Sequence, residues 1–315
     1  MLVFENSFRT FACARPMKNL PSPFVLLARL ALCAALAASL PASADSHQAF
    51  TVERFSLPGP VAGVVVKVDL SDARVRVMVA LADDRDPDGD GPCVGQLDTT
   101  SNAARKLDVQ VALNASFFAV PATRDFEGKR IAYFAGNCGY PVGWHFSDGR
   151  LRASPAGNKF RATLIVHEGG RVSIAEDVKQ LPADTRFAVS GSALLLAQGK
   201  PPVAYVPLAF DQVRHPRSAV GLSADARTLL LLAIDGRQSG HSRGATLAEL
   251  TALLQNFGAD SAINLDGGGS TALVLKDPAT GVYAVANQPS DKAALPIPLS
   301  VERPVIDIIG IRIAP

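Results

Sequence analysis

Residues 246–274 have the sequence TLAELTALLQNFGADSAINLDGGGSTALV, which predicts a helix, a strand and a glycine turn in succession. Leucines and one phenylalanine recur along a single helical stripe between positions 247 and 257. Thr246 and Glu249 have the spacing of a capping box, and Gly258 stands where a helix stops. The apolar run at 261–265 predicts a strand, so Asp266 is expected at the end of that strand.

Three glycines, 267–269, follow Asp266 and precede Ser270. Glycine tolerates positive φ and lets a ligand approach the backbone, and successive N–H groups in such a turn can form an anion-binding nest. Asp266 is then suited to acid–base or nucleophilic chemistry on the adjacent anion. The alternative is a tight turn in which Asp266 only caps the backbone. The loop does not have the Walker A pattern G-x-x-x-x-G-K-[ST].

Two further strands are predicted to end on polar residues. Residues 228–235, TLLLLAID, form a nearly continuous apolar run that predicts a strand buried on both faces and ending on Asp235. The segment 109–114 predicts a strand that ends on Asn114. Ligands bind at strand ends in open sheets of this kind, so these residues and Asp266 are expected at one site.

Basic residues accompany these strand ends. Arg214, His215 and Arg217 precede an apolar strand, and Arg237 and His241 lie in the loop after residue 235. A guanidinium can bind phosphate in bidentate fashion, which suits Arg217 to that role. Each residue alone is typical of a surface charge, but together at one sheet edge they predict an anion site.

The N-terminus predicts a cleaved signal peptide over residues 1–44. An apolar run from Phe24 to Leu40 carries only Arg29 as a charge and is followed by small residues up to Ala44. A transmembrane anchor is the alternative, but the run is short. Residues 45–315 are therefore expected in the periplasm or outside the cell, with no membrane span after cleavage.

The charge changes when the leader is removed. Residues 1–44 contain four basic residues and one acidic residue, so the full-chain charge of +2 becomes −1. The basic isoelectric point belongs to the leader, and no electrostatic footprint for nucleic acid remains. The oligomeric state does not follow from the sequence.

Cys93 and Cys138 are the two cysteines that remain after cleavage, and in an exported chain they predict one disulfide. The alternatives are two free thiols or a partial metal site, but no histidines stand nearby at zinc-finger spacing. The acidic loop before Cys93 carries Asp86, Asp88 and Asp90, which match the first half of an EF-hand. Leu97 occupies the twelfth position, so a solvated turn is favoured over a calcium site. No cofactor is required, although a divalent cation such as calcium stays open.

The remaining sequence predicts short strands separated by turns, as in antiparallel sheet. Residues 63–81 predict a hairpin around Ser71–Ala73, and residues 99–107 predict a short helix. The sequence shows no internal repeat or low-complexity linker. We therefore expect a mixed α+β fold with strand-rich, twisted sheets and a few packed helices, in a single domain over 45–315.

Several segments in order resemble the phosphodiester glycosidase family, from Val109 to Ile313. They are ALNASFF, AVSGSALLLAQGK, HPRSAVGLS, LLLLAIDGRQSG, the helix with NLDGGGST, and NQPSD with RPV. The resemblance implies a mixed α and β fold and removal of a sugar from a sugar-1-phosphodiester. One departure is visible, because Ala115 and Ser116 follow Asn114 where the family usually has two glycines. Their Cβ atoms are expected to narrow the pocket or to change the backbone there.

The resemblance also implies the site residues. The implied catalytic residues are Asp266, Asp235, Asn264 and Arg217. The implied substrate-binding residues are Asn114, Arg237, Gly267, Gly268, Gly269, Ser270, Ser290 and Asp291. Within this set, Arg217 and the loop N–H groups would hold phosphate, and Asp266 would face the anomeric carbon or activate water. Asn114 and Asn264 would bind sugar hydroxyls or orient Asp266.

The function expected from these observations is an exported glycosidase that hydrolyses sugar-1-phosphodiesters in envelope or extracellular glycoconjugates. Its partner would be a sugar phosphodiester or a phosphorylated glycan. Two alternatives stay open: a non-catalytic periplasmic protein that binds or assembles polysaccharide, and a phosphodiesterase that cleaves P–O. The nucleophile elbow G-x-S-x-G and the zinc motif H-E-x-x-H are absent from the sequence.

Overall fold

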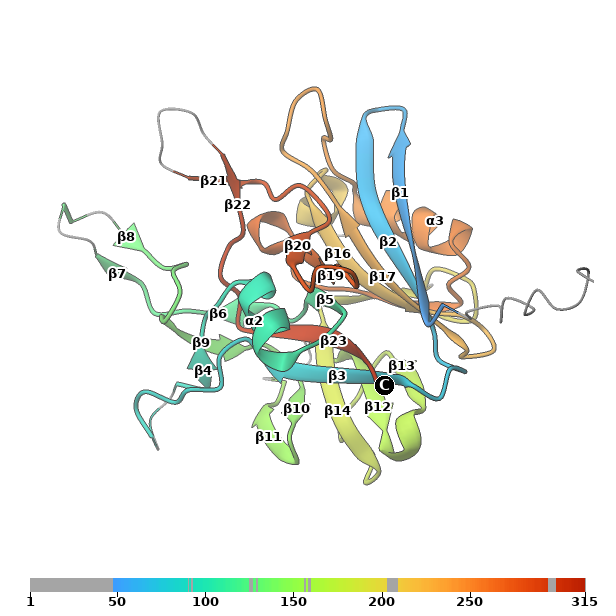
Figure 1. The fold of residues 1–315 in the computed structure, drawn as a ribbon, viewed down its shortest axis with the longest axis horizontal. Coiled ribbons are helices and arrows are strands. Elements are labelled where there is room, and N and C mark those ends of the chain that lie inside the picture. Colours follow the sequence, from blue (N-terminus) through green and yellow to red (C-terminus); the bar gives the residue numbers. More distant parts are fainter. Residues whose placement is uncertain are drawn as a thin grey trace, which may run out of the picture. The chain divides into compact units, whose positions relative to one another are not determined.

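The computed structural model describes residues 48–314 except positions 90, 92, 125, 126, 129, 156, 158, 159, 203–208 and 294–298. The predicted signal peptide lies outside the described residues. Strands dominate these residues, and every pairing between strands is antiparallel (Figure 1). Two α-helices accompany the strands in this part of the chain, so the strand-rich α+β expectation is roughly met.

The largest sheet has six strands and contains the apolar run predicted to be buried on both faces. This run is β17 (Thr228–Ile234), in which every residue after Thr228 is buried. Helix α3 (Leu247–Asn256) covers one face of the sheet, because Leu250 and Leu254 pack against Leu230 and Leu232. The strand order is β1 (Phe50–Leu57), β2 (Val61–Asp69), β17, β16 (Arg217–Leu222), β18 (Ser261–Asn264) and β15 (Ala193–Leu196).

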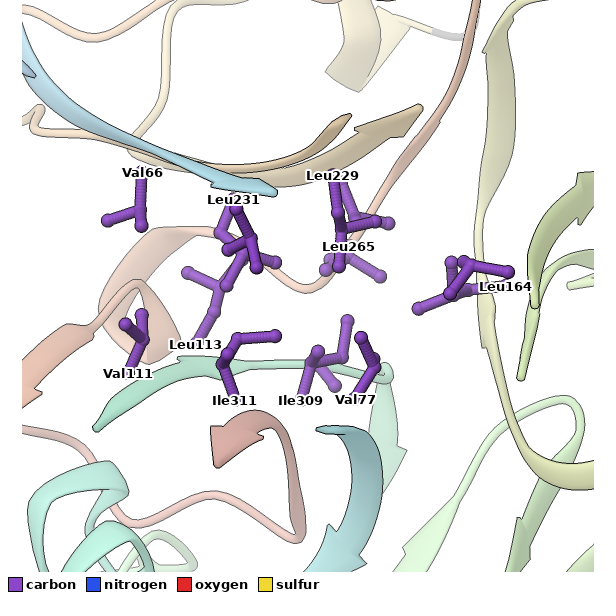
Figure 2. Packing of buried hydrophobic residues seen from close by; sticks show 14 of the residues in the cluster. Val66, Val77, Val111, Leu113, Leu164, Leu229, Leu231, Leu265, Ile309 and Ile311 are labelled. Carbon is purple, nitrogen blue, oxygen red and sulfur yellow. The ribbon is translucent and has the colours of Figure 1, made fainter. Parts of the chain in front are cut away.

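A five-stranded sheet packs against the other face of this first sheet. Figure 2 shows Val66 and Leu231 above Val111 and Ile311 in the shared core. Alternation along the strands puts these residues on the same face as their apolar neighbours two positions away. The strand order is β20 (Tyr283–Val285), β19 (Leu273–Lys276), β5 (Val111–Asn114), β23 (Asp307–Ile313) and β3 (Val75–Leu81).

A third sheet of five strands completes the core, to which it contributes Leu164 (Figure 2). Its order is β11 (Arg150–Ala153), β10 (His145–Ser147), β14 (Thr185–Gly191), β12 (Ala162–His167) and β13 (Val172–Ala175). The smaller strands are β4 (Gly95–Gln96), β6 (Phe118–Ala119), β7 (Thr123–Arg124), β8 (Arg130–Ile131), β9 (Cys138–Pro141), β21 (Asp291–Lys292) and β22 (Ser300–Val301).

Both predicted helices form, and α3 has its predicted capping box. The Thr246 hydroxyl accepts the amide of Glu249, and the Glu249 carboxylate accepts the amide of Thr246, which completes the capping box of α3. Helix α2 (Thr100–Leu107) begins after Thr99, whose hydroxyl accepts the amide of Asn102. Side-chain capping satisfies amides that have no partner inside a helix, so local sequence was sufficient to locate both helix starts.

The hairpin predicted over residues 63–81 is wrong in its pairing. The strands exist as β2 and β3, but β2 pairs with β1 and β17, whereas β3 pairs with β23. The connection between them passes from the first sheet to the second. Alternation along a strand predicts which face is buried, but it does not specify the partner strand.

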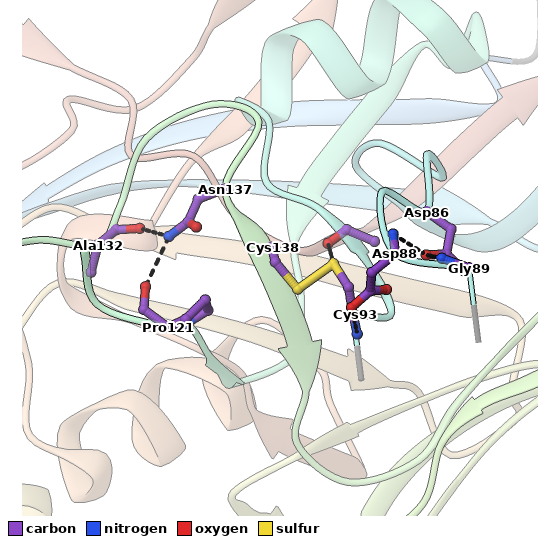
Figure 3. The surroundings of a disulfide bond; sticks show 9 residues. Asp86, Asp88, Gly89, Cys93, Pro121, Ala132, Asn137 and Cys138 are labelled. Carbon is purple, nitrogen blue, oxygen red and sulfur yellow. Dashed lines mark hydrogen bonds between the residues drawn. A yellow bond between two sulfur atoms is a disulfide. The ribbon is translucent and has the colours of Figure 1, made fainter. Parts of the chain in front are cut away.

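The predicted disulfide is confirmed between Cys93 and Cys138, whose Cα atoms are 5.5 Å apart (Figure 3). In the acidic loop, the Asp86 carboxylate accepts the amides of Asp88 and Gly89, and the Asp88 carboxylate accepts the amide of Cys93. These carboxylates therefore hold the loop's own backbone, while Asp90 lies outside the described residues. No helix in the described ranges is long and apolar enough to cross a membrane.

Candidate active site

The strand topology brings two predicted carboxylates to the same end of the first sheet. β16 is antiparallel to both β17 and β18, so β17 and β18 run in the same direction. Asp235 and Asp266 therefore leave the sheet at one end, as the sequence predicted. Asn114 ends β5 in the second sheet, and its side chain reaches across to residue 266.

The glycine turn needs glycine for two reasons. Gly268 has φ of +63°, in the left-handed region that favours glycine. Gly267 lies so close to the neighbouring strand that a Cβ there would be 2.6 Å from the carbonyl oxygen of Pro216. The turn is thus a compact structure pressed against the start of β16.

Three amides of this turn are used within the protein. The amide of Gly268 donates to the Pro216 carbonyl at 2.9 Å, that of Ser270 to Gly267 at 3.2 Å, and that of Thr271 to Gly268 at 3.3 Å. These amides therefore do not form the predicted anion-binding nest. Substrate binding by the three glycines stays a prediction.

Asn114 holds both ends of the turn. Its side-chain amide donates to the main-chain oxygen of Asp266 at 2.7 Å, and its Oδ1 accepts the amide of Ala272 at 3.1 Å and the hydroxyl of Ser218 at 2.7 Å. The side chain is completely buried. This position orients the segment that carries Asp266, which was one of the two roles expected for Asn114.

The carboxyl group of Asp266 has a strongly shifted pKa. The residue keeps partial exposure, but the surrounding protein removes so much hydration that the pKa rises from 3.8 to about 7. Asp307 raises it further, whereas Ser270, Arg303 and the amide of Gly267 lower it. A carboxyl with a pKa near neutrality can accept or donate a proton at physiological pH.

Several unpartnered polar atoms belong to residues close in sequence to Asp266 or to Asp291. Of the six buried side-chain atoms without a hydrogen-bond partner in the described ranges, four belong to Asn264, Ser270, Thr271 and Ser290. The Ser270 hydroxyl is close enough to lower the pKa of Asp266, but it does not reach full hydrogen-bond geometry. A buried polar atom without a partner costs roughly 1–3 kcal/mol. A polar ligand that hydrogen-bonds to these atoms would remove that cost.

Two arginines lie against the glycine turn. A Cβ on Gly268 would be 3.0 Å from the Arg237 guanidinium, and a Cβ on Gly269 would meet Arg303 and Asp291. Arg237 is exposed and has φ of +59°, an uncommon conformation for a residue with a side chain. Guanidinium groups therefore lie against two successive residues of the turn, Arg237 at Gly268 and Arg303 at Gly269.

Each arginine has a partner that fixes it. Arg303 makes a bidentate pair with Asp291 at 2.9 and 3.2 Å. Arg237 lies 3.3 Å from Nδ1 of His215, and burial together with the charge of Arg237 lowers the pKa of His215. A neutral imidazole can accept a hydrogen bond from Arg237, so the lowered pKa favours this contact.

A model of phosphodiester glycosidases matches residues 108–312, which include all of the strand ends described above. This chain belongs to the phosphodiester glycosidase family. The match confirms the resemblance found in the sequence.

Solved structures share the fold of this chain. The auto-inhibited catalytic domain of zebrafish N-acetylglucosamine-1-phosphodiester alpha-N-acetylglucosaminidase has a TM-score of 0.59 and 22% identity, with 85% of each chain covered. A putative exported protein from Burkholderia pseudomallei K96243 has a TM-score of 0.52 and 19% identity, covering 80% of this chain and 74% of that one. The SPbeta prophage-derived uncharacterized protein YomE of Bacillus subtilis is 30% identical over 179 residues. That match covers 56% of this chain but only 23% of YomE.

Arg217, which the phosphodiester glycosidase pattern includes, points into the protein. The residue is 1% exposed. Its Nε donates to the carbonyl of Ala245 at 3.0 Å, and one terminal nitrogen donates to the carbonyls of Val213 and Phe210 at 3.0 and 3.2 Å. This geometry argues against the predicted phosphate-binding role of Arg217 and indicates that it holds the 210–217 segment. Arg237 has the exposure that the role needs.

Asp235 is also held within the protein. Its carboxylate accepts the side-chain amide of Asn287 at 3.1 Å and the main-chain amide of Gln288 at 2.7 Å, and it pairs with His241 at 2.8 Å. Asp235 and His241 line a cavity of ≈ 470 Å³ together with residues of β1, β2 and 286–288. The catalytic role implied for Asp235 stays a prediction, and the contacts indicate that it positions residues 287–288.

Ser116 shows the structural consequence of the departure from the family pattern. Its amide and hydroxyl both donate to the Asp307 carboxylate, at 2.8 and 2.7 Å. The same carboxylate lies 2.8 Å from Nδ1 of His145, and all three residues are buried. The added hydroxyl therefore binds Asp307, whose charge adds to the larger effect of burial in raising the pKa of Asp266.

Sequence reasoning missed Arg303, Asp307 and Thr271 at this site. Arg303 lies in the RPV segment that closes the family resemblance, so its sequence context was noticed but not its role. Asp307 begins β23, and its location near Asp266 depends on the pairing of β23 with β5. For Asp307, the polar type of the residue was the only signal available in the sequence.

Proposed function

We propose that this chain is an exported hydrolase that releases the sugar from a sugar-1-phosphodiester. The observation that supports it most is the Asp266 carboxyl, with a pKa of about 7, at a turn flanked by Arg237 and Arg303. An ionisable group beside cations suits a reaction in which an anionic leaving group departs. When such a substrate is bound, its sugar hydroxyls or phosphate oxygens can hydrogen-bond to the unpartnered polar atoms of Asn264, Ser270 and Thr271.

In the proposed mechanism, Arg237 binds the phosphate and the ionised Asp266 activates water. Asp266 takes a proton from the water that attacks the anomeric carbon. The bond from that carbon to the phosphate oxygen breaks, and the phosphomonoester leaves with both electrons. A phosphomonoester is a weak base, so charge stabilisation by Arg237 contributes more than protonation of the leaving oxygen.

Hydrolysis of a defined substrate tests this function. The purified protein without residues 1–44 is incubated with a sugar-1-phosphate methyl diester, and released sugar is measured. Asp266→Asn should reduce kcat by about 10²–10⁴-fold, which is typical for loss of a general base, while circular dichroism shows an intact fold. No sugar release by the wild-type protein would refute the proposal, and binding without turnover would favour the non-catalytic alternative.

Isotope-labelled water separates cleavage of C–O from cleavage of P–O. With ¹⁸O water, we expect the label in the released sugar, because water attacks the anomeric carbon. Label in the phosphate would instead assign the protein as a phosphodiesterase. Both products are identified by mass spectrometry from the same reaction.

The proposed location is the periplasm or the exterior, where envelope or extracellular glycoconjugates would be the substrates. The Cys93–Cys138 disulfide and the N-terminal sequence support export, since disulfides persist in oxidising compartments. The similar Burkholderia protein, described as a putative exported protein, agrees with this location. Fractionation of cells that express the full chain tests it, and a cytoplasmic protein with residues 1–44 retained would contradict it.

We expect the proposed reaction to proceed without an added metal. Asp86 and Asp88 cap amides of their own loop, so a cation is not needed to hold these carboxylates together. Sugar release should therefore survive dialysis against EDTA. A loss that calcium restores, and that Asp86→Asn reproduces, would establish the cation site.

A further inference from the structure

An exposed tyrosine lies beside the site and has no part in the mechanism above. Tyr133 is 50% exposed, although large aromatic side chains are mostly buried in folded proteins. The Arg303 guanidinium lies 4.4 Å from the centroid of its ring. The ring of Phe118 meets it edge to face, with centroids 5.9 Å apart.

The segment that carries Tyr133 is held on both sides of the residue. Before it, the Ala132 carbonyl accepts the side-chain amide of Asn137 at 2.6 Å. After it, the Gly136 amide donates to the Leu97 carbonyl at 2.8 Å, and Cys138 is joined to Cys93 (Figure 3). The ring is thus positioned in advance, which lowers the entropy cost of binding a ligand.

Arg303 connects this ring to the glycine turn. The arginine contacts Tyr133 on one side and pairs with Asp291 next to Gly269. Arg237 lies against Gly268, the preceding residue of the turn. Arg303 also lowers the pKa of Asp266, so the same guanidinium lies near Asp266, the glycine turn and Tyr133.

We propose that Tyr133 is a platform, meaning an aromatic surface on which the pyranose ring of the substrate packs. The inference rests on the proposed function, because it takes the phosphate to lie at Arg237. A pyranose has a face of C–H groups that packs on an aromatic ring, while its hydroxyls reach polar partners at the edge. Asn264, Ser270 and Thr271, within five residues of Asp266 in the chain, have polar atoms without a partner that could serve this purpose. The platform selects a sugar ring over an acyclic polyol phosphate.

Calorimetry with two phosphates tests the platform without requiring turnover. The probes are α-glucose 1-phosphate, which carries a pyranose, and glycerol 1-phosphate, which does not. Tyr133→Ala should weaken binding of the sugar phosphate by about five- to tenfold and leave that of the glycerol phosphate unchanged. Tyr133→Phe should bind both like the wild type, since the ring and not the hydroxyl makes the contact.

Two control variants test whether Tyr133, rather than another exposed aromatic residue, binds the sugar ring. Phe134→Ala removes another exposed aromatic residue from the same loop, and Phe210→Ala removes one from the Arg237 side of the turn. Both should retain the preference for the sugar phosphate. An equal loss in Phe134→Ala, or a loss confined to Phe210→Ala, would overturn the assignment to Tyr133.

The outcomes also separate this inference from the proposed function. A wild-type protein that hydrolyses the diester but binds both phosphates equally refutes the platform alone. A wild-type protein that prefers the sugar phosphate through Tyr133 but never releases sugar refutes the hydrolase and retains the platform. Binding of neither phosphate would refute both.

Discussion

At Asp266, burial and charge act on the same carboxyl group in opposite directions. Loss of hydration raises the pKa, whereas Ser270 and the charge of Arg303 lower it. The result, about 7, means that both protonation states are populated near neutral pH. One residue can therefore exchange protons with water or substrate, provided that its surroundings stay intact.

The shifted pKa makes folding stability depend on pH. An unfolded aspartate has a pKa near 3.8, so between that value and about 7 the folded state holds a proton that the unfolded chain has released. Stability of the wild type should therefore fall as pH rises through this window. Asp266→Asn should raise Tm at pH 8, and the gain should vanish near pH 4. Thermal unfolding at several pH values measures this, and a constant difference would contradict it.

Arg303 should set the pH at which the proposed enzyme becomes active. Activity that uses the ionised Asp266 should rise with pH and reach half its maximum near 7. Arg303→Gln removes a charge that lowers this pKa, so the rise should move to higher pH. The pH profile of kcat/KM measures the shift, and Arg303→Lys should restore the wild-type midpoint. An unchanged midpoint in Arg303→Gln would exclude this electrostatic role.

At Gly268 in the glycine turn, both the backbone conformation and the lack of space for a side chain favour glycine. Gly268 and Gly281 both have positive φ, of +63° and +71°. A Cβ at Gly281 would meet nothing within 4 Å, whereas one at Gly268 would approach Arg237 at 3.0 Å. The two positions therefore separate the cost of backbone conformation from the cost of crowding.

Alanine at these two glycines should have different effects on function. Each substitution should lower stability by about 1 kcal/mol, because alanine is strained at positive φ. Gly268→Ala should also displace Arg237 and weaken binding of inorganic phosphate, whereas Gly281→Ala should not. Urea unfolding and calorimetry measure the two effects. Equal phosphate affinity in both variants would show that Arg237 is not the phosphate site.

The disulfide is expected to stabilise the segment between β4 and β9. It closes a loop with a sequence separation of 45 residues, for which chain entropy predicts a contribution on the order of 4 kcal/mol. The Cys93→Ser, Cys138→Ser double variant should lose roughly 2–4 kcal/mol in urea unfolding. Wild-type protein reduced with dithiothreitol should unfold at the same urea concentration as the variant. An unchanged midpoint in both samples would show that the loop is already held by its other contacts.

Over residues 48–314, the three large sheets share one hydrophobic core. Val66 of β2, Ile309 of β23 and Leu164 of β12 all belong to it (Figure 2). A core built from all three sheets cannot lose one of them without exposing the apolar faces of the others.

This sharing predicts a single cooperative unfolding transition. In scanning calorimetry, the calorimetric and van't Hoff enthalpies should agree for the protein without its leader. Leu164→Ala should move the entire transition to lower temperature, because the cavity that it leaves lowers the free energy of unfolding by about 2–5 kcal/mol. Two separated transitions would instead mean that one of the sheets unfolds on its own.

Sequence alone determined the elements whose signals are local. The capping box of α3, the buried β17 and the glycine turn after Asp266 depend on nearby residues, and the structure contains all of them. The common direction of β17 and β18 also followed from the helix between them, so the shared edge of Asp235 and Asp266 was predictable. The family resemblance rests on these same local segments.

Only the tertiary structure decided which side chains face the site. Arg217 and Arg237 are the same residue type next to neighbouring strand ends, yet one binds carbonyls inside the protein and the other is exposed at the turn. Arg303 lies against the turn and contacts Tyr133, although these two residues are 170 positions apart in the chain. Side-chain direction and long-range pairing depend on which strands become neighbours, and a pattern of two or three residues carries no information about that choice.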